Sequence, residues 1–143
     1  MKEIDILLVE DNEGDIVLTM EALDDARILN KVYVKRDGAE ALDFLYSKID
    51  NNTSELPDLI LLDINLPKID GKEVLHKIKT HPTLKKIPVV MLTTSSSEVD
   101  ILESYNNHAN CYIIKPVDLN KFFNIVKAIE NFWVTIVKLP AKD

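Results

Sequence analysis

Carboxylate, hydroxyl and ammonium side chains follow four short apolar runs of this chain. These polar positions are Glu10-Asp11, Asp63, Thr93-Thr94 and Lys115-Pro116. Three carboxylates held close together repel one another, and the usual remedies are a proton or a cation. Oxygen ligands of this kind suit Mg²⁺, which neutralises an incoming phosphoryl group beside a carboxylate nucleophile. With an ammonium and a hydroxyl to bind phosphoryl oxygens, the set is suited to forming an aspartyl phosphate.

Each of these positions also has a plainer interpretation. Glu10-Asp11 could be a turn and helix-cap pair, and Asp63 could be a simple loop acid. Thr93 could merely end a β-strand, and Lys115 could be a solvated surface lysine. The functional interpretation is favoured because all four positions fall at strand ends of one predicted sheet.

Apolar runs alternate with amphipathic segments along the chain and predict alternating strands and helices. The predicted strands lie at 4–9, around 32–34, at 59–62, at 88–92 and at 112–114. The predicted helices cover 14–28, 38–49, 71–80 and 97–106, and a last helix is capped by Asp118. Residues 50–57 are polar and turn-forming, so we expect a surface loop there. In the first helix the residues at helical spacing, expected to face the core, are Ile16, Val17, Met20, Leu23 and Ala26.

Five strand–helix units imply a parallel sheet covered on both faces, because each right-handed crossover must bury its helix. We therefore predict an α/β fold, a flavodoxin-like doubly wound (βα)5 three-layer sandwich with strand order 2-1-3-4-5. The 143 residues suffice for a single domain over 1–143. Ligands of such sheets bind beyond the carboxyl ends of the strands, where the polar positions fall.

Composition excludes some function classes. The formal net charge is 17 − 24 = −7, and an acidic protein repels phosphate backbones, so nucleic-acid binding is disfavoured. No stretch approaches the roughly 20 apolar residues of a membrane span and no signal-peptide pattern is present, so we expect a cytoplasmic protein without a membrane partner. Lysines gather at Lys68, Lys72, Lys77, Lys79, Lys85 and Lys86. We interpret them as a solvated helix face, with a patch for an anionic ligand as the alternative.

Strings around the polar positions resemble those of bacterial receiver domains of two-component signalling. They are Val9-Glu10-Asp11-Asn12, Leu61-Leu62-Asp63-Ile64-Asn65-Leu66-Pro67 with Asp70-Gly71, Val90-Met91-Leu92-Thr93-Thr94-Ser95 and Tyr112-Ile113-Ile114-Lys115-Pro116, and their spacing covers essentially the whole chain. The resemblance implies that Asp63 is the phosphoacceptor, which becomes a 4-aspartylphosphate. It also implies that Asp11 binds Mg²⁺ (or Mn²⁺) directly and that Glu10 supports the ion, often through water. The backbone carbonyl of Asn65 would complete the protein ligands.

The same resemblance implies a conformational switch. Thr93 would move to bind the phosphoryl group, Lys115 would pair with it, and Lys115-Pro116 would be a cis peptide. Tyr112 matches the aromatic residue that swings inward when the Thr93 hydroxyl is drawn to the phosphate. The alternative for Tyr112 is a half-buried aromatic residue at the sheet edge.

Some strings are similar to those of small receivers paired with bacterial phytochrome-type histidine kinases. They include Ala109-Asn110-Cys111-Tyr112 and the segment 131–140. The resemblance therefore implies a sensor histidine kinase as the partner, with the phytochrome type as the candidate. One departure is His108, where receivers commonly carry Gly, and a left-handed backbone there costs a modest amount of stability. Cys111 is expected to be a small buried hydrophobic residue, and His76 and His81 are expected at the surface.

The last helix is predicted to outreach the sheet. Residues 118 to about 138 would span roughly 30 Å, whereas a strand of five or six residues covers ~17–20 Å. The apolar face of this helix is Phe122, Ile125, Val126, Ile129, Trp133 and Ile136. An exposed apolar overhang predicts a homodimer built on the fourth helix (97–106), the fifth strand (112–114) and this fifth helix. In the alternative, the end of the helix folds back on its own domain.

The leading functional hypothesis is a stand-alone signalling module in which a histidine kinase passes a phosphoryl group to Asp63 and a protein-interaction surface switches. Such a module has no DNA-binding output domain, and it is not an enzyme beyond Mg²⁺-dependent self-phosphorylation and slow autodephosphorylation. A phosphohydrolase with an Asp nucleophile is a second hypothesis, but it needs a general acid two residues after Asp63, and Asn65 cannot be one. A third is a pseudo-receiver that binds without phosphate. Arguing against it is the intact set Asp11, Asp63, Thr93 and Lys115.

Overall fold

One parallel sheet of five strands organises the chain. The computed structural model describes residues 4–26, 30–51, 55–97, 99 and 111–128, apart from the side chains of 123 and 125–128. The strands are β1 (Ile4–Val9), β2 (Asn30–Lys35), β3 (Leu59–Asp63), β4 (Val89–Thr93) and β5 (Cys111–Ile114). Every neighbouring pair is parallel, and the order β2-β1-β3-β4-β5 confirms the predicted doubly wound sheet.

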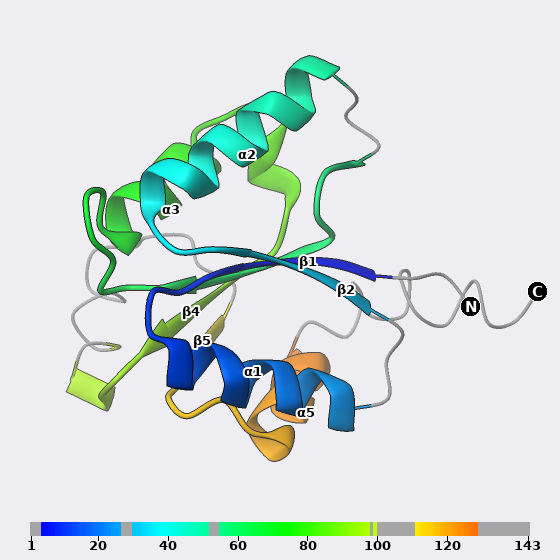
Figure 1. Ribbon diagram of the computed structural model, residues 1–143, viewed down its shortest axis with the longest axis vertical. Coiled ribbons are helices and arrows are strands. Elements are labelled where there is room, and N and C mark those ends of the chain that lie inside the picture. The colour runs from blue at the N-terminus through cyan, green and yellow to red at the C-terminus, as the bar shows by residue number, and fades with distance from the viewer. Residues whose placement is uncertain (1–3, 27–29, 52–54, 98, 100–110, 129–143) are drawn as a thin grey trace, which may run out of the picture.

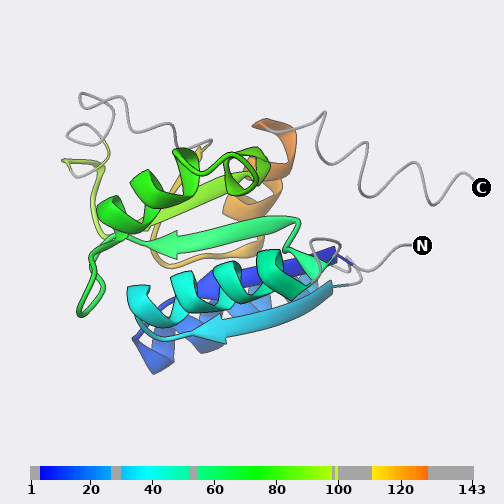
Figure 2. The same cartoon turned by 90° about the horizontal axis from the view of Figure 1, so that it is seen from above.

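Helices cover both faces of this sheet (Figure 1). Helices α2 (Gly38–Asn51) and α3 (Gly71–Lys79) lie on one face, and α1 (Glu13–Asp25) and α5 (Leu119–Ala128) lie on the other. Figure 2 looks onto the first face and shows α2 and α3 lying over the strands. A short 3-10 helix, η2 (Leu84–Lys86), leads into β4. The three layers match the predicted sandwich.

Aliphatic side chains fill the spaces between the layers. The cluster under α2 and α3 includes Leu7, Val9, Ile60, Leu62, Leu42, Leu45, Val74 and Ile78. The cluster under α1 and α5 includes Ile6, Leu8, Leu61, Leu92, Ile16, Leu23 and Phe122. Successive residues of β1 and β3 thus alternate between the two clusters, and both faces are apolar because both are covered.

The register brings the carboxyl ends of the strands to one edge. Val9 is paired with Leu62, and Asp63 is paired with Leu92. Thr93 is paired with Ile114. Glu10, which follows β1, therefore lies level with Asp63, the last residue of β3, and the last residues of β4 and β5 are paired with each other. The sheet therefore has the edge, formed by the carboxyl ends of its strands, at which the polar residues were predicted to meet.

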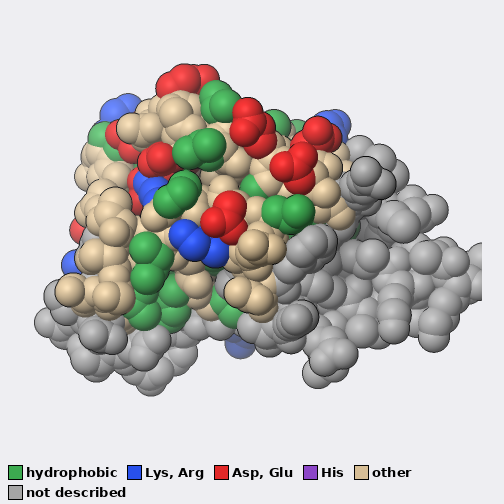
Figure 3. Space-filling model, turned by 90° about the horizontal axis from the view of Figure 1, so that it is seen from below, with side chains coloured by type: hydrophobic (Ala, Val, Ile, Leu, Met, Phe, Trp, Pro, Cys, Tyr) green, Lys and Arg blue, Asp and Glu red, His purple; other side chains and the backbone are tan. Residues whose placement is uncertain are grey.

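The buried face of α1 differs from the prediction. Its buried residues are Ile16, Thr19, Ala22 and Leu23, whereas Val17, Leu18 and Met20 are 47%, 43% and 40% exposed. The inward placement of Val17 and Met20 was wrong, because the helix turns its small residues Thr19 and Ala22 toward the core. Figure 3 shows this side of the molecule, where apolar side chains lie among acidic ones.

The connection from α3 to β4 uses two residues that were expected at the surface. His81 is half-buried, and its Nδ1 accepts hydrogen bonds from the backbone nitrogens of Thr83 (3.1 Å) and Leu84 (3.3 Å). Lys79 Nζ donates to the carbonyl oxygens of Lys85 (3.2 Å) and Ile87 (2.7 Å). Both side chains therefore satisfy backbone groups of a turn, and the prediction for His81 was wrong. His76 is exposed as predicted.

Other differences lie at the ends of elements. Helix α2 continues through Asn51, so the loop expected from residue 50 starts later, and β4 begins at Val89 and includes Thr93. Cys111 is half-buried, not fully buried, because β5 forms one edge of the described sheet. Residues 100–106 of the expected fourth helix, His108, and the overhang beyond residue 128 lie outside the described residues. Within the described part of the chain, no helix is both long and apolar enough to cross a membrane.

Candidate functional site

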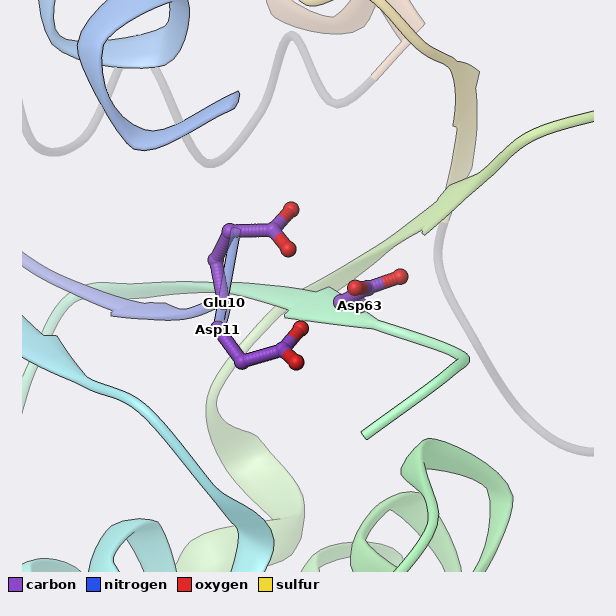
Figure 4. Close-up of side chains that lie close together, drawn as sticks. All are labelled: Glu10, Asp11 and Asp63. Atoms are coloured by element: carbon purple, nitrogen blue, oxygen red, sulfur yellow. The ribbon is translucent and has the colours of Figure 1, made fainter. Parts of the chain in front are cut away.

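Three carboxylates meet at the carboxyl edge of the sheet (Figure 4). Glu10 and Asp11 directly follow β1, and Asp63 is the last residue of β3. Glu10 and Asp63 are buried, at 0% and 2% exposure, while Asp11 is exposed. One oxygen from each lies within 4.8 Å of the others. The structure therefore brings together the three acidic residues that the strand ends predicted.

The Lys115 ammonium lies against the same carboxylates. Lys115 follows β5, and its backbone nitrogen donates to the carbonyl oxygen of Thr93 (2.7 Å). Its Nζ lies 2.8 Å from Glu10 Oε1 and 3.1 Å from Asp63 Oδ2. The Lys115-Pro116 peptide bond is cis. Lys115 is thus a cation at the site with only 11% of its side chain exposed, and not the solvated lysine of the alternative interpretation.

A fourth carboxylate, which sequence reasoning missed, also contacts Lys115. Asp15 Oδ2 lies 3.0 Å from Lys115 Nζ. Asp15 sits in the first turn of α1, where its backbone nitrogen donates to the Asn12 side chain (2.9 Å). The contact joins residues 100 positions apart. Only the folded structure, in which the first turn of α1 meets the residue after β5, reveals it, since an acid in a first helical turn is ordinary.

Burial and crowding shift the protonation of the site. The pKa of the Glu10 carboxyl is raised to about 7, first because burial disfavours its charged form and then because Asp63 lies beside it. Burial alone would lower the pKa of the Lys115 ammonium, but the surrounding carboxylates, Glu10 foremost, outweigh burial and raise it. Three carboxylates contact the Lys115 ammonium, and Asp11 adds a fourth carboxylate to the cluster. The site therefore carries excess negative charge.

The donor set fits a divalent cation. Glu10 Oε1 is buried without a hydrogen-bond partner, and its 2.8 Å contact with Lys115 Nζ is an ion pair that lacks hydrogen-bond geometry. A cation held by Glu10, Asp11 and Asp63 would compensate this oxygen and the excess charge. Carboxylate oxygens without sulfur or imidazole ligands suit Mg²⁺ and Mn²⁺. The exposed Asp11 leaves the site open to water and to an incoming group.

Backbone contacts fix the loops that carry these acids. Asn65 nitrogen donates to Asp63 Oδ1 (3.3 Å), and Gly71 nitrogen donates to the Ile64 carbonyl oxygen (2.8 Å). Gly71 begins α3 so close to Asp63 that a Cβ at this position would overlap the Asp63 carbonyl oxygen. The start of α3 therefore packs directly on the backbone of the central carboxylate, and only glycine fits there.

Thr93 and Tyr112 lie on the two strands next to the acidic cluster. Thr93 is fully buried, and its hydroxyl donates to the Ser95 carbonyl oxygen (3.2 Å) and accepts from the Ser95 nitrogen (3.4 Å). Tyr112 is half-buried and packs against the core cluster under α2 and α3. The register pairs it with Met91, two residues before Thr93. The hydroxyl and the aromatic ring thus belong to neighbouring strands.

Comparisons with known proteins agree with this geometry. A family model described as the response regulator receiver domain matches residues 6–127. The response regulator Rcp1 of Synechocystis sp. is 48% identical over 95% of this chain and 92% of its own length. The Mn²⁺-bound form of Rcp1 has a TM-score of 0.71 at 47% identity, covering 94% of this chain and 96% of that one. The phosphorylated cyanobacterial phytochrome response regulator RcpA has a TM-score of 0.73 at 51% identity, with the same coverage.

Fold, acidic cluster and relatives lead to one assignment. The sheet order is that of the solved bacteriophytochrome response regulators, and Glu10, Asp11 and Asp63 fit the divalent-metal site of receiver domains. The match covers most of the chain and most of its relatives' length. The chain therefore belongs to the response regulator receiver domain family.

Proposed function

We propose that Asp63 accepts a phosphoryl group from a histidine kinase in a Mg²⁺-dependent reaction. The family implies phosphorylation of an aspartate and a kinase partner. One observation supports Asp63 in particular: its buried carboxylate lies between the acidic side chains that can hold a cation and the Lys115 ammonium, 3.1 Å away. No other carboxylate of the described residues combines a place in this cluster with the end of the central strand β3.

The reaction is a nucleophilic displacement at phosphorus. An Asp63 carboxylate oxygen attacks the phosphorus atom of a phosphohistidine, and the oxygen–phosphorus bond forms as the phosphorus–nitrogen bond breaks. The electron pair of the broken bond stays on the imidazole nitrogen. The product is a mixed anhydride on Asp63, which water can later hydrolyse. Receiver response regulators are generally not enzymes in their own right, and self-phosphorylation with slow autodephosphorylation is the extent of the chemistry we propose.

Each neighbour of Asp63 has a role in this proposal. Asp11, Asp63 and the Asn65 backbone carbonyl hold Mg²⁺ or Mn²⁺, and Glu10 supports the ion. When bound, the cation neutralises charge on the phosphoryl oxygens. Lys115 donates to a phosphoryl oxygen as a point charge.

The switch in this proposal couples Thr93 to Tyr112. The Thr93 hydroxyl is held by the Ser95 backbone at 3.2 and 3.4 Å, both long for hydroxyl hydrogen bonds. A phosphoryl oxygen on Asp63 offers a stronger, charged acceptor. Movement of Thr93 toward it frees the space into which the half-buried Tyr112 swings. The changed face of β4 and β5 then carries the signal to a protein partner.

The surface formed by β5 and α5 is also the basis of a proposal about oligomeric state. Ile114 on β5, at one edge of the described sheet, is 38% exposed. We infer that residues 1–143 form one receiver domain. We also infer a homodimer whose interface comprises the fourth helix, β5, and α5 with the segment beyond it. Sedimentation of a chain ending at Asn131 tests this. An unchanged monomer–dimer equilibrium contradicts it.

The partner and compartment are further proposals. RcpA is a phytochrome response regulator, and its 51% identity to this chain supports a phytochrome-type kinase as the donor. A cytoplasmic location follows from a kinase donor that phosphorylates its own histidine with ATP. Phosphotransfer profiling against histidine kinases of the host tests the partner, and preference for a kinase without a phytochrome sensor contradicts it.

Acetyl phosphate tests the central proposal. With Mg²⁺, the wild-type chain gains the mass of one phosphoryl group, and chelation of the metal prevents this gain. Asp63→Asn removes the nucleophile while keeping the shape of the side chain, so it abolishes labelling in a folded protein. The control is Asp43→Asn, which changes an exposed carboxylate of α2 and leaves labelling intact. Labelling of Asp63→Asn at the wild-type rate contradicts the proposal.

A further inference from the structure

Asp15 is a carboxylate at the site that the proposed reaction has not yet used. Its Oδ2 lies 3.0 Å from Lys115 Nζ, and its side chain is 30% exposed. The three carboxylates around this ammonium are Glu10 at 2.8 Å, Asp15 at 3.0 Å and Asp63 at 3.1 Å. A lysine ammonium has three donors and no acceptor. Hydrogen bonds to Asp15 and Asp63 and the ion pair with Glu10 therefore engage this ammonium before a phosphoryl group arrives.

Phosphorylation changes two of these three partners. Asp63 becomes an anhydride and its negative charge moves to the phosphoryl oxygens. Glu10 belongs to the cluster that fits the cation, where its oxygen lies within 4.8 Å of those of Asp11 and Asp63. Among the described residues, Asp15 is the one carboxylate that contacts Lys115 Nζ from outside that cluster. It alone keeps its charge and its acceptor for Lys115 once the cation and the phosphoryl group are bound.

We propose that Asp15 is a positioning residue that holds Lys115 in place to meet the phosphoryl group. The inference rests on the proposed function, because Lys115 must bind that group. Asp15 is not a member of the acidic cluster that fits the cation, so in this proposal it acts through Lys115 alone. Asp15 restricts the rotamers of the long Lys115 side chain, whose conformational freedom otherwise opposes binding of the phosphoryl group.

An ordinary capping role does not account for the orientation of Asp15. In a capping box, the acid three residues after the cap reaches back to the cap nitrogen. Here the Asn12 nitrogen donates to Glu10 Oε2 (3.3 Å), and Asp15 Oδ2 points to Lys115. The other acid of this turn, Glu13, pairs with Arg36 at 2.7 Å and is 69% exposed. Two carboxylates in one helical turn therefore have different environments, which supplies a matched control.

The test compares Asp15→Ala, Asp15→Asn and Glu13→Ala in the full chain. Both Ala variants remove a first-turn carboxylate and its interaction with the helix dipole, and alanine is compatible with the helix. Asp15→Asn keeps an acceptor for Lys115. We measure Mg²⁺ affinity by calorimetry, the affinity of the Mg²⁺-loaded protein for beryllium fluoride, a phosphoryl mimic, and the acetyl phosphate labelling rate. Denaturant unfolding checks the fold.

Asp15→Ala is expected to weaken beryllium fluoride binding and to slow labelling, each by about fivefold. This magnitude corresponds to the loss of one hydrogen bond between charged groups, reduced because Asp15 is partly exposed to solvent. Asp15→Asn and Glu13→Ala are expected to stay within about twofold of wild type on both measurements. Mg²⁺ affinity is expected to change little in all three variants. A merely structural role would lower stability and leave the phosphoryl mimic's affinity unchanged.

Two outcomes overturn the inference. In the first, Asp15→Ala matches Glu13→Ala in beryllium fluoride affinity and labelling rate. In the second, Asp15→Ala weakens Mg²⁺ binding as much as it weakens binding of the mimic, which would make Asp15 part of the metal site. Failure of the proposed function has a different signature, since the wild-type chain itself would then neither label nor bind the mimic.

Discussion

Replacement of Gly71 by alanine tests how tightly α3 is joined to the phosphoacceptor. A Cβ at Gly71 would overlap the Asp63 carbonyl oxygen and would lie 2.7 Å from Ile64 Cα and 3.0 Å from the Asp63 carbonyl carbon. All three are backbone atoms, so no side-chain rotation relieves the overlap. The start of α3 must move away from β3, or the backbone of Asp63 must shift.

The size of the effect follows from two opposing terms. Overpacking a well-packed region costs about 1–3 kcal/mol, and rigid backbone neighbours place this case at the upper end. Replacing glycine by alanine also restricts the unfolded chain, which favours folding by about 0.4–1 kcal/mol. Gly71→Ala should therefore lower the free energy of unfolding by about 2 kcal/mol. Because the shift occurs at Asp63, Mg²⁺ affinity should fall as well.

Urea unfolding followed by circular dichroism measures the stability, and calorimetry measures Mg²⁺ binding. Gly14→Ala is the control, since its Cβ would overlap no backbone atom and would meet one side-chain oxygen, Asn12 Oδ1, at 3.3 Å. It should change the free energy of unfolding by no more than about 0.5 kcal/mol. Gly71→Ala with wild-type stability and wild-type Mg²⁺ affinity would refute the close junction of α3 and Asp63.

Further predictions concern protonation and donor binding. Folding raises the pKa of Glu10 to about 7, so protonated Glu10 contributes to the free energy of unfolding. This contribution is fully present below the pKa of the unfolded state and is lost as the pH rises through 7. Glu10→Gln should remove this loss, as measured by urea unfolding of the metal-free protein. Mg²⁺ competes with that proton, so calorimetric Mg²⁺ affinity should rise between pH 6 and 8 in wild type, and an equal rise in Glu10→Gln would contradict this. Val17 and Met20 expose apolar surface on α1, and we expect a protein donor to contact that surface. Val17→Ser with Met20→Ser should therefore slow transfer from a kinase several-fold and spare labelling by acetyl phosphate. The control is Tyr46→Ser, at a 37% exposed residue of α2, and equal slowing there would contradict the role of α1.

The strand ends were predictable because two simple periodicities place them. Apolar runs fix where strands stop, and a parallel sheet must bring those ends to one edge. This logic gathered Glu10, Asp63 and Lys115 correctly, and the structure has Lys115 Nζ within 3.1 Å of both acids. The resemblance to a known family, and not the periodicity, supplied the roles of Asn65 and Tyr112.

What escaped prediction depends on packing between distant segments. The burial of Thr19 and Ala22 in α1 follows from how closely the helix approaches the sheet, which hydrophobicity alone does not encode. The contact of Asp15 with Lys115 requires the first turn of α1 to reach the residue that follows β5. Position 71 requires glycine because it packs on the backbone of Asp63, eight positions earlier. This contact is evident only in the folded structure, where the loop brings the two residues together.

Chemical trapping of the modified residue tests the central claim most directly. After incubation with acetyl phosphate and Mg²⁺, borohydride reduces an acyl phosphate to an alcohol, and peptide mass spectrometry then locates the changed residue. The account predicts homoserine at the position of Asp63, dependent on Mg²⁺ and absent when the metal is chelated. Reduction at any other carboxylate, or a phosphoryl group that resists borohydride because it sits on a histidine or a hydroxyl, would contradict it.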